Sequence, residues 1–543
     1  MDKELPARTG VAAGLVVAGA GALVVAWVLG DDFVEPEPAP WLTRVGTVVV
    51  VGILGGLVYL LRQRPADRAV RLVTLTAAAV ALALTVLAGW GFVDQYGRGF
   101  PGQATLLAAV GGLAVTVGVL LFRPDGGWRR WITVLPAFLL VPALATPLVL
   151  IAPDVRLDAT TATATEAAPV PETVSKVAWS TAVNGRVRDI VAAGAGVVVL
   201  LENGLVAIDG RTGDIRWTRV RHGTETEEID VSPDGATVLV ELHPIDLGPT
   251  RREVIDAFTG QLRFTVDPGD PVARTSWFSP MTNTSYLGSN EDDSEFYGYS
   301  LTDGSKLWTY RAPTDCWVMT GRTGRYAVAA GMLLPINCQR GDTFEFRYVL
   351  LNGTTGKVRW EYSVRKDTLS NGAKILTELA PDRRFLAMDI YQPEMGKAVL
   401  DTETGKAVSS VPPLNLQAAG IAISNSYDDP QFIDVTTGKT LPSTEASRSC
   451  LKVKYEITLT SQIACVSPAV DSFYELAESG RTELAMGGFA DTELKSVPIT
   501  LGGPFEKEFG NDPIRSAAAP GALVVTTGLT PLGDNRVQVV GLR

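Results

Sequence analysis

The side chains most suited to chemistry in this 543-residue sequence are two histidines, two acidic clusters and four cysteines. His222 and His243 each lie in a polar stretch between predicted strands. Two histidines are too few for a multi-histidine metal centre, and no Gly-x-Ser-x-Gly motif accompanies them to suggest a serine hydrolase. We therefore predict that both histidines are exposed loop residues and that the chain has no catalytic residue of this kind.

The acidic clusters are Glu291-Asp292-Asp293 and Asp428-Asp429. Neither has the regular alternation of carboxylates that a calcium loop uses, so we predict solvated acidic loops and no metal site. The formal net charge of −11 also makes nucleic acid or anionic lipid an unfavourable partner.

All four cysteines lie in the C-terminal two thirds of the chain. Pairing by proximity predicts one disulfide between Cys316 and Cys338 and a second between Cys450 and Cys465, in an oxidising compartment. The spacing is too wide for a zinc knuckle.

Five uncharged apolar stretches precede this region, at about residues 10–29, 45–61, 72–92, 104–122 and 132–152. About 20 apolar helical residues span a bilayer core, so residues 1–152 are predicted to form a five-helix transmembrane bundle. Arginine and lysine are concentrated in alternate loops, which predicts a cytoplasmic N-terminus, a multi-pass plasma-membrane location and an extracytoplasmic C-terminal domain. Residues 153–173 are rich in Ala, Thr and Pro and are predicted to be an extended, mobile linker.

From residue 174 to residue 543 the pattern changes to short strands separated by turn residues. A motif with Asp or Asn, then Thr-Gly, then Trp recurs at an average spacing of about 45 residues, as in propeller blades. The glycine supplies the positive φ of a hairpin turn, the Asp or Asn accepts backbone hydrogen bonds, and the Trp packs over that turn and against the adjacent blade. The predicted blade-docking residues are Asp209, Thr212, Gly213, Trp217, Asp256, Thr259, Gly260, Trp308, Asn352, Thr355, Gly356, Trp360, Asp401 and Asp434.

The repeat from Ala207 to Trp217 resembles the tryptophan-docking motif of PQQ-like quinoprotein β-propellers. The resemblance covers roughly residues 176 to 543 and implies a fold of the same kind as WD40-like rings. It does not imply one activity, since the family includes both dehydrogenases and cofactor-free assembly proteins. The composition of the apolar region favours a bacterial member, with an actinobacterium as the candidate source.

Eight blades are the favoured count, with seven as the alternative. Seven turn motifs are visible, and the C-terminal strands provide one further blade. The segment KVAWSTAV at residues 176–183 is predicted to join those C-terminal strands as their outer strand, which closes the ring.

The resemblance raises the alternative of a PQQ-dependent, calcium-containing sugar or alcohol dehydrogenase in the membrane. Such enzymes commonly place the quinone against a disulfide of adjacent cysteines, and no two cysteines are adjacent here. We therefore predict a protein that is not an enzyme and has no cofactor. The expected function is an accessory or scaffold subunit for envelope assembly or another membrane complex, with protein partners bound through the propeller loops and the helix bundle. Binding of a glycolipid or another small ligand is a further alternative.

Overall fold

The computed structural model describes most of the C-terminal part of the chain. The described residues are 157–543 except 222–223, 245–250, 267–279, 290–294, 319–325, 341–342, 367–373, 392–397, 410–413, 418–419, 425–429, 452–454, 460–461, 467–475, 506–513 and 533–535. Most of them belong to one compact unit made of Ala159–Val220, Thr226–Leu242 and Thr250–Arg543. The other unit holds Met1–Asp158 and two short segments, Arg221–Glu225 and His243–Pro249.

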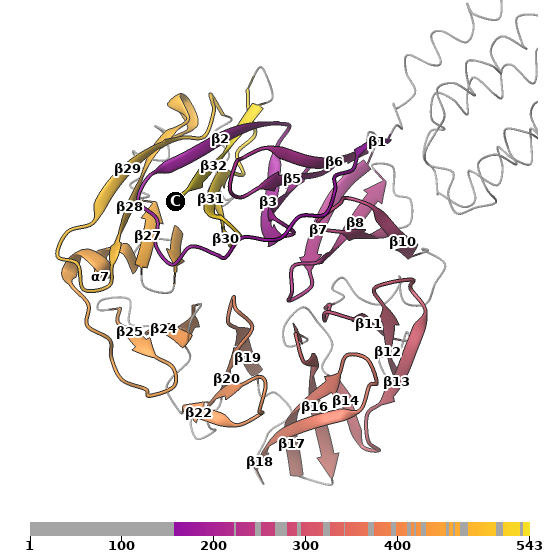
Figure 1. The fold of residues 1–543 in the computed structure, drawn as a ribbon. Coiled ribbons are helices and arrows are strands. Elements are labelled where there is room, and N and C mark those ends of the chain that lie inside the picture. Colours follow the sequence, from indigo (N-terminus) through magenta and orange to yellow (C-terminus); the bar gives the residue numbers. More distant parts are fainter. Residues whose placement is uncertain are drawn as a thin grey trace, which may run out of the picture. The chain divides into compact units, whose positions relative to one another are not determined.

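The compact unit is a β-propeller with eight antiparallel sheets arranged around an axis (Figure 1). The first four blades follow one another along the chain. Blade 1 contains β3 (Val187–Ala193), β4 (Gly196–Leu201), β5 (Gly204–Asp209) and β6 (Ile215–Arg221), and β1 (Leu157–Thr160) pairs with β6 at its outer edge. Blade 2 contains β7 (Thr224–Val231), β8 (Thr237–Pro244), β9 (Arg251–Asp256) and β10 (Leu262–Val266). Blade 3 contains β11 (Ser285–Ser289), β12 (Glu295–Ser300) and β13 (Lys306–Arg311), and blade 4 contains β14 (Cys316–Val318), β15 (Tyr326–Val328), β16 (Gly331–Arg340), β17 (Thr343–Asn352) and β18 (Val358–Lys366).

The remaining four blades complete the ring. Blade 5 contains β19 (Lys374–Leu379), β20 (Phe385–Tyr391), β21 (Ala398–Asp401) and β22 (Ala407–Ser409), and blade 6 contains β23 (Leu414–Leu416), β24 (Ile421–Ser424) and β25 (Phe432–Asp434). Helix α7 (Glu445–Leu451) leads to blade 7, which contains β26 (Tyr455–Thr458), β27 (Gln462–Val466), β28 (Arg481–Gly488) and β29 (Lys495–Thr500). Blade 8 contains β30 (Ile514–Ala519), β31 (Ala522–Thr527), β32 (Arg536–Leu542) and, from the other end of the domain, β2 (Val177–Asn184). The predicted count of eight blades is confirmed.

The burial of the strands follows their place in a blade. Every residue of β4, GVVVLL, and of β31, ALVVTT, is buried, because a middle strand is covered on both faces by the neighbouring blades. The outer strand β6 alternates between buried and more exposed side chains, as expected for a strand with only one covered face. Apolar side chains therefore fill the spaces between blades.

The predicted ring closure is also confirmed. Strand β2 pairs antiparallel with β32, from Val177 opposite Leu542 to Asn184 opposite Arg536. The two ends of the domain thus share blade 8, and the sheet that would otherwise end at β32 gains an outer strand. Figure 1 shows β2 lying along β32 at the outside of that blade.

The segment between β1 and β2 differs from the predicted mobile linker. It is extended, but it is held on the propeller by hydrogen bonds along its length. Ala162 N donates to Thr259 O at 2.9 Å, Gly521 N donates to Pro169 O at 3.0 Å, and Gln462 Nε2 donates to Val174 O at 2.9 Å. Few large apolar side chains are needed to hold such a segment, because its backbone groups make the contacts.

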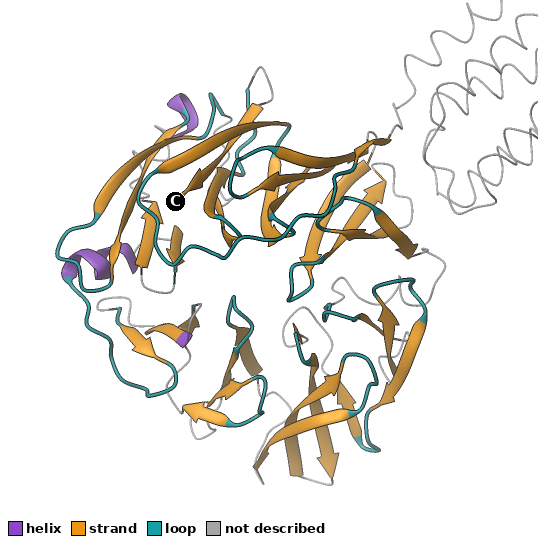
Figure 2. Ribbon diagram, in the orientation of Figure 1, coloured by secondary structure: helices purple, strands orange, loops and turns teal. Residues whose placement is uncertain are grey.

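The structure also corrects the predicted transmembrane bundle and plasma-membrane location. Within the described residues, no helix is long and apolar enough to cross a membrane. Helix α7 has seven residues, about 10 Å at 1.5 Å per residue, against a hydrocarbon core of about 30 Å. Figure 2 shows that the described chain is almost entirely strands and loops. The five proposed spans all fall within residues 1–156, outside the described residues.

Candidate functional site

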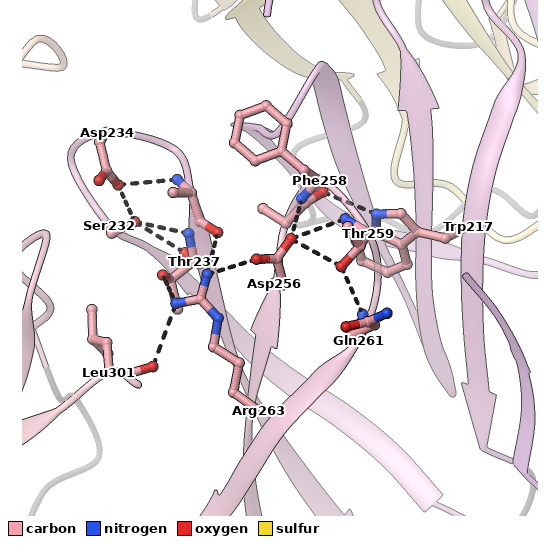
Figure 3. A network of polar contacts seen from close by, with 12 residues as sticks. Trp217, Ser232, Asp234, Thr237, Asp256, Phe258, Thr259, Gln261, Arg263 and Leu301 are labelled. Atoms are coloured by element: carbon pink, nitrogen blue, oxygen red, sulfur yellow. Dashed lines mark hydrogen bonds and ion pairs between the residues drawn. The ribbon is translucent and has the colours of Figure 1, made fainter. Parts of the chain in front are cut away.

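The turn between β9 and β10 shows how the repeated motif works (Figure 3). Asp256 Oδ1 accepts hydrogen bonds from Phe258 N at 3.1 Å and from Thr259 N and Oγ1 at 3.0 Å each. Gly260 N donates to Asp256 O at 2.8 Å, and Gly260 has a φ of +74°. The carboxylate therefore satisfies the turn amides, and the glycine takes a conformation that other residues rarely adopt.

The same turn recurs in other blades. Each motif Asp or Asn accepts bonds from the amides two and three residues later, and its carbonyl accepts a bond from the motif glycine at 2.8 Å; the residues are Asp209, Asn352, Asp401 and Asp434. Hydrogen bonds, first from Thr436, hold the pKa of Asp434 below its usual range. Burial opposes ionisation of Asp256, but hydrogen bonds from Arg263 and Thr259 outweigh it and lower its pKa. These carboxylates are thus occupied by the turns.

Each docking tryptophan contacts the turn of the next blade. The Trp217 ring lies over Gly260, where an added Cβ would come within 2.7 Å of it, and Trp217 Nε1 donates to Ala257 O at 2.9 Å. In the same way Trp308 lies over Gly356, and Trp360 lies over Gly405. The predicted contact of each ring with the adjacent blade is therefore found, but the turn that the indole covers belongs to that blade and not to its own hairpin.

Trp179 is a docking residue that the sequence-based prediction missed. It lies on β2, its ring covers Gly213, and its Nε1 donates to Gly210 O at 2.9 Å. The residue has no Thr-Gly turn shortly before it, because β2 comes from the start of the domain. Its place on the predicted closing strand was the available signal.

In blade 2 the docking position holds Phe264, which has no N–H to donate. Its ring still lies against Gly304, 3.0 Å from an added Cβ. The neighbouring Arg263 provides the missing donor: its Nη1 lies 3.4 Å from Leu301 O, the carbonyl that corresponds to Ala257 O in the previous turn. Arg263 Nη2 also pairs with Asp256 Oδ2 at 2.7 Å, so one guanidinium joins blade 2 to blade 3 (Figure 3).

Both predicted disulfides are present. Cys316–Cys338 joins β14 to β16, and Cys450–Cys465 joins α7 to β27. Of the remaining residues with chemical potential, His243 lies in β8 and is half-buried rather than exposed in a loop. His222 and the two acidic clusters lie outside the described residues.

Charged groups meet near the axis, at the ends of the innermost strands. Arg383 follows β19 in blade 5, yet its Nη2 donates to Val231 O of blade 2 at 2.8 Å and its Nη1 to Ala327 O of blade 4 at 3.2 Å. It also lies 3.8 Å from Asp230 Oδ1. Arg383 has a φ of +58°, a conformation that costs a non-glycine residue about 1–2 kcal/mol. The corresponding turn of blade 2 has Gly235 at this position.

Three carboxyl groups on the innermost strands have raised pKa values. Burial raises the pKa of Asp230 to about 6, although Arg383 acts in the opposite direction. Burial also raises the pKa values of Asp189 on β3 and Glu378 on β19. Raised carboxyl pKa values often mark functional sites, but burial between strands for structural reasons produces them as well.

Two further ion pairs lie buried between or within the first blades. Arg219 on β6 contacts Glu253 on β9 at 2.6 Å, which links blade 1 to blade 2. Arg252 contacts Glu241 at 2.9 Å within blade 2. Such pairs cost desolvation and favour one arrangement of neighbouring elements over others.

The docking tryptophans and the disulfides of the described residues are engaged in contacts within the propeller. Trp179, Trp217, Trp308 and Trp360 donate to backbone carbonyls of neighbouring blades, so their rings are held between blades. The two disulfides join separate strands or a helix and a strand. No group of three or more His, Cys, Asp or Glu among the described residues is arranged to hold a metal ion.

One protein family and several solved structures are similar to this chain. A protein-family model described as "Outer membrane protein assembly factor BamB" matches residues 248–441. No curated protein matches the chain significantly. Similar solved structures include a eukaryotic initiation factor, with 12% identity over 63% of this chain and 96% of that chain and a TM-score of 0.37. The WD40 domain of SCAP from fission yeast has 10% identity, covers 71% and 98%, and has a TM-score of 0.34.

A third similar structure is the dihydro-heme d1 dehydrogenase NirN in complex with DHE, with 12% identity over 77% of this chain and 91% of that chain and a TM-score of 0.34. These structural likenesses are too weak to carry an argument. The fold and its turns define the class, a closed β-propeller with Asp-Thr-Gly turns under aromatic rings. The family match over residues 248–441 and these turns support a PQQ-like β-propeller family.

Proposed function

We propose that the propeller is a non-catalytic scaffold or accessory subunit that binds a protein partner in a complex, with a role in assembly. The observation that carries this proposal is that the most conspicuous side chains make structural contacts within the propeller. The motif carboxylates bond to their own turns, and the docking indoles bond to the next blade. The family match to an assembly factor supports the same role. The two disulfides fit work in an oxidising environment.

A rigid ring suits this function because it holds its loops in fixed positions without losing conformational entropy when a partner binds. The ring has three kinds of link between its parts. Aromatic rings cover glycines of the next blade, the buried Arg219–Glu253 pair joins blades 1 and 2, and β2 closes blade 8. We propose that this ring works without a cofactor.

Affinity purification of the full-length protein after mild chemical cross-linking tests the scaffold function. One or more proteins should co-purify reproducibly and in constant ratio, and a tagged unrelated propeller should not capture them. Recovery of the chain alone under several extraction conditions would contradict the proposal.

A second measurement separates the scaffold from the enzyme and ligand-binding alternatives. Added PQQ and calcium should produce neither quinone binding nor dye reduction with sugars or alcohols. Native mass spectrometry should show no bound glycolipid or other small molecule. Saturable quinone binding with substrate-dependent dye reduction would contradict the scaffold function and identify the protein as a dehydrogenase.

A further inference from the structure

The first strand of blade 4 is divided in two, unlike those of the other described blades. Strand β14 pairs with Ile336–Cys338 of β16, and β15 pairs with Gly331–Leu333 of the same strand, so both lie on one edge of β16. Departures from a repeat frequently carry binding residues, because the repeat itself does not need them.

The first half of this divided strand and the residues before it, here called the β14 segment (residues 312–318), are held rigidly. The Cys316–Cys338 disulfide ties it to β16, with the two Cα atoms 4.0 Å apart. Cys316 N donates to Pro313 O at 3.0 Å, and Gln339 N donates to Asp315 O at 2.9 Å. Asp315 has a φ of +66°, which is unfavourable for an aspartate in isolation and is kept here by these contacts.

Trp317 is displayed at the surface of the β14 segment. Its neighbour Val318 is buried in the core of blade 4, and successive residues of a strand point to opposite faces. Trp317 is accordingly 43% exposed, whereas the docking residues Trp217 and Trp308 are 0% and 6% exposed. A large aromatic ring on a rigid element loses little entropy on binding and is a common anchor of protein interfaces.

The charge beside this ring indicates the kind of partner. Asp315 is exposed two residues before Trp317, and the nearby Arg311 is already ion-paired with Glu295. The chain as a whole has a net charge of −11. A guanidinium or ammonium group is attracted both by an indole face and by a carboxylate.

We infer that the β14 segment is a docking surface for a basic protein segment, with an Arg or Lys side chain stacked on Trp317 and paired with Asp315. The inference rests on the proposed scaffold function, for which it names the surface and the chemistry of the partner. Neither the repeat nor the disulfide requires an exposed tryptophan at this position.

A fluorescein-labelled hexa-arginine peptide serves as the probe, with the full-length protein titrated by fluorescence anisotropy. Trp317→Ala should weaken binding about two- to fivefold, and Trp317→Phe should weaken it less because a ring face remains. Leu307→Ala is the matched control, since Leu307 is 41% exposed in blade 3 and should not affect binding. Asp315→Asn should weaken binding and lower its salt dependence more than Glu403→Gln, which removes an exposed charge from a turn of blade 5.

The outcomes separate this surface from the general function. Wild-type affinity in Trp317→Ala, or an equal loss in Leu307→Ala, would overturn the inference. A dimer that becomes a monomer in Trp317→Ala would instead identify a second copy of the chain as the occupant. If cross-linked partners are retained by Trp317→Ala, the scaffold function stands and the surface is wrong. If the wild-type protein captures no partner, the scaffold function fails, and the peptide titration still reports on the surface.

Discussion

At the residue scale, the motif Asp and Trp side chains, which the sequence made candidates for a functional site, make structural hydrogen bonds. The Asp256 carboxylate accepts hydrogen bonds from its turn and pairs with Arg263, and the indole N–H of Trp217 donates to Ala257 O. An aspartate near a tryptophan in the sequence therefore does not imply a site here. The residues in energetically costly positions are different ones, Arg383 and Asp230 at the axis and Asp315 in blade 4.

Gly260→Ala tests the contact between ring and turn, with Gly235→Ala as its control. Both glycines have positive φ, +74° and +70°, so each substitution should cost about 1 kcal/mol of unfolding free energy. At Gly260 the new Cβ also meets the Trp217 ring, whereas at Gly235 the nearest atom is 3.7 Å away. Gly260→Ala should thus lose about 1–3 kcal/mol more in urea denaturation. Equal losses would show that the ring contact contributes nothing.

Asp230→Asn tests the buried carboxyl group at the axis. The pKa of Asp230 is about 6 in the folded protein and 3.8 ordinarily, so the folded state binds the proton more tightly. The contribution of this group to stability is full below the unfolded pKa and is lost as pH rises through 6, on the order of 2–3 kcal/mol. The wild type should therefore gain stability relative to Asp230→Asn between pH 7.5 and pH 5 in urea denaturation. Arg383→Met should move this transition above pH 6, and a difference independent of pH would contradict the assignment.

At the scale of elements, the same ring-over-turn contact recurs at the interfaces between successive blades. Three blades present a Trp to the next turn, blade 8 presents Trp179, and blade 2 presents Phe264 with Arg263. In each of these interfaces, the backbone carbonyl of the second turn residue accepts a hydrogen bond from the preceding blade. The donor is an indole N–H or, at Leu301, a guanidinium N–H. The interface therefore tolerates different residues as long as a flat ring and a donor remain.

A double-mutant cycle on Arg263 and Phe264 tests whether the Arg263 guanidinium replaces the indole N–H as donor to Leu301 O. Arg263→Met should cost about 1–3 kcal/mol, because it removes bonds to Leu301 O and to Asp256. In the Phe264→Trp background the indole can donate to Leu301 O, so the same substitution should cost about 0.5–1.5 kcal/mol less. Additive effects in thermal and urea denaturation would show that the two donors are not equivalent.

At the scale of the whole propeller, one strand from the start of the domain closes the ring. Strand β2 pairs with β32 along its length and places Trp179 against blade 1. The segment before it makes hydrogen bonds to blades 2, 8 and 7. The start and the end of the domain must therefore both be made before the ring can close.

Replacing residues 177–184 by four Gly-Ser pairs tests this closure. The variant should lose most of its cooperative unfolding and should self-associate, because β32 becomes an exposed strand edge. The same replacement at residues 163–170 keeps the length and retains β2, so it should leave the fold intact with a small loss of melting temperature. Light scattering and thermal denaturation distinguish the two variants. If the variant with residues 177–184 replaced is monomeric and unfolds with normal cooperativity, closure of the ring by β2 is contradicted.

The sequence by itself determined the propeller, the closing strand and the disulfide pairs, because these depend on local signals. A turn that needs Gly, short strands and cysteines 15 or 22 residues apart are all recognisable within one repeat of the sequence. The five apolar stretches also gave a clear signal, but the membrane bundle inferred from them is not supported by the described structure.

Only the tertiary structure decided which blade each ring contacts, how Arg263 replaces an indole donor, and that Arg383 reaches a carbonyl 152 residues away. It also decided that residues 161–174 lie along the propeller rather than apart from it. The physical reason is that these contacts depend on which blades become neighbours when the ring closes. A repeating pattern specifies the blade, but every blade carries nearly the same pattern, so the contacts between blades follow from their order in space.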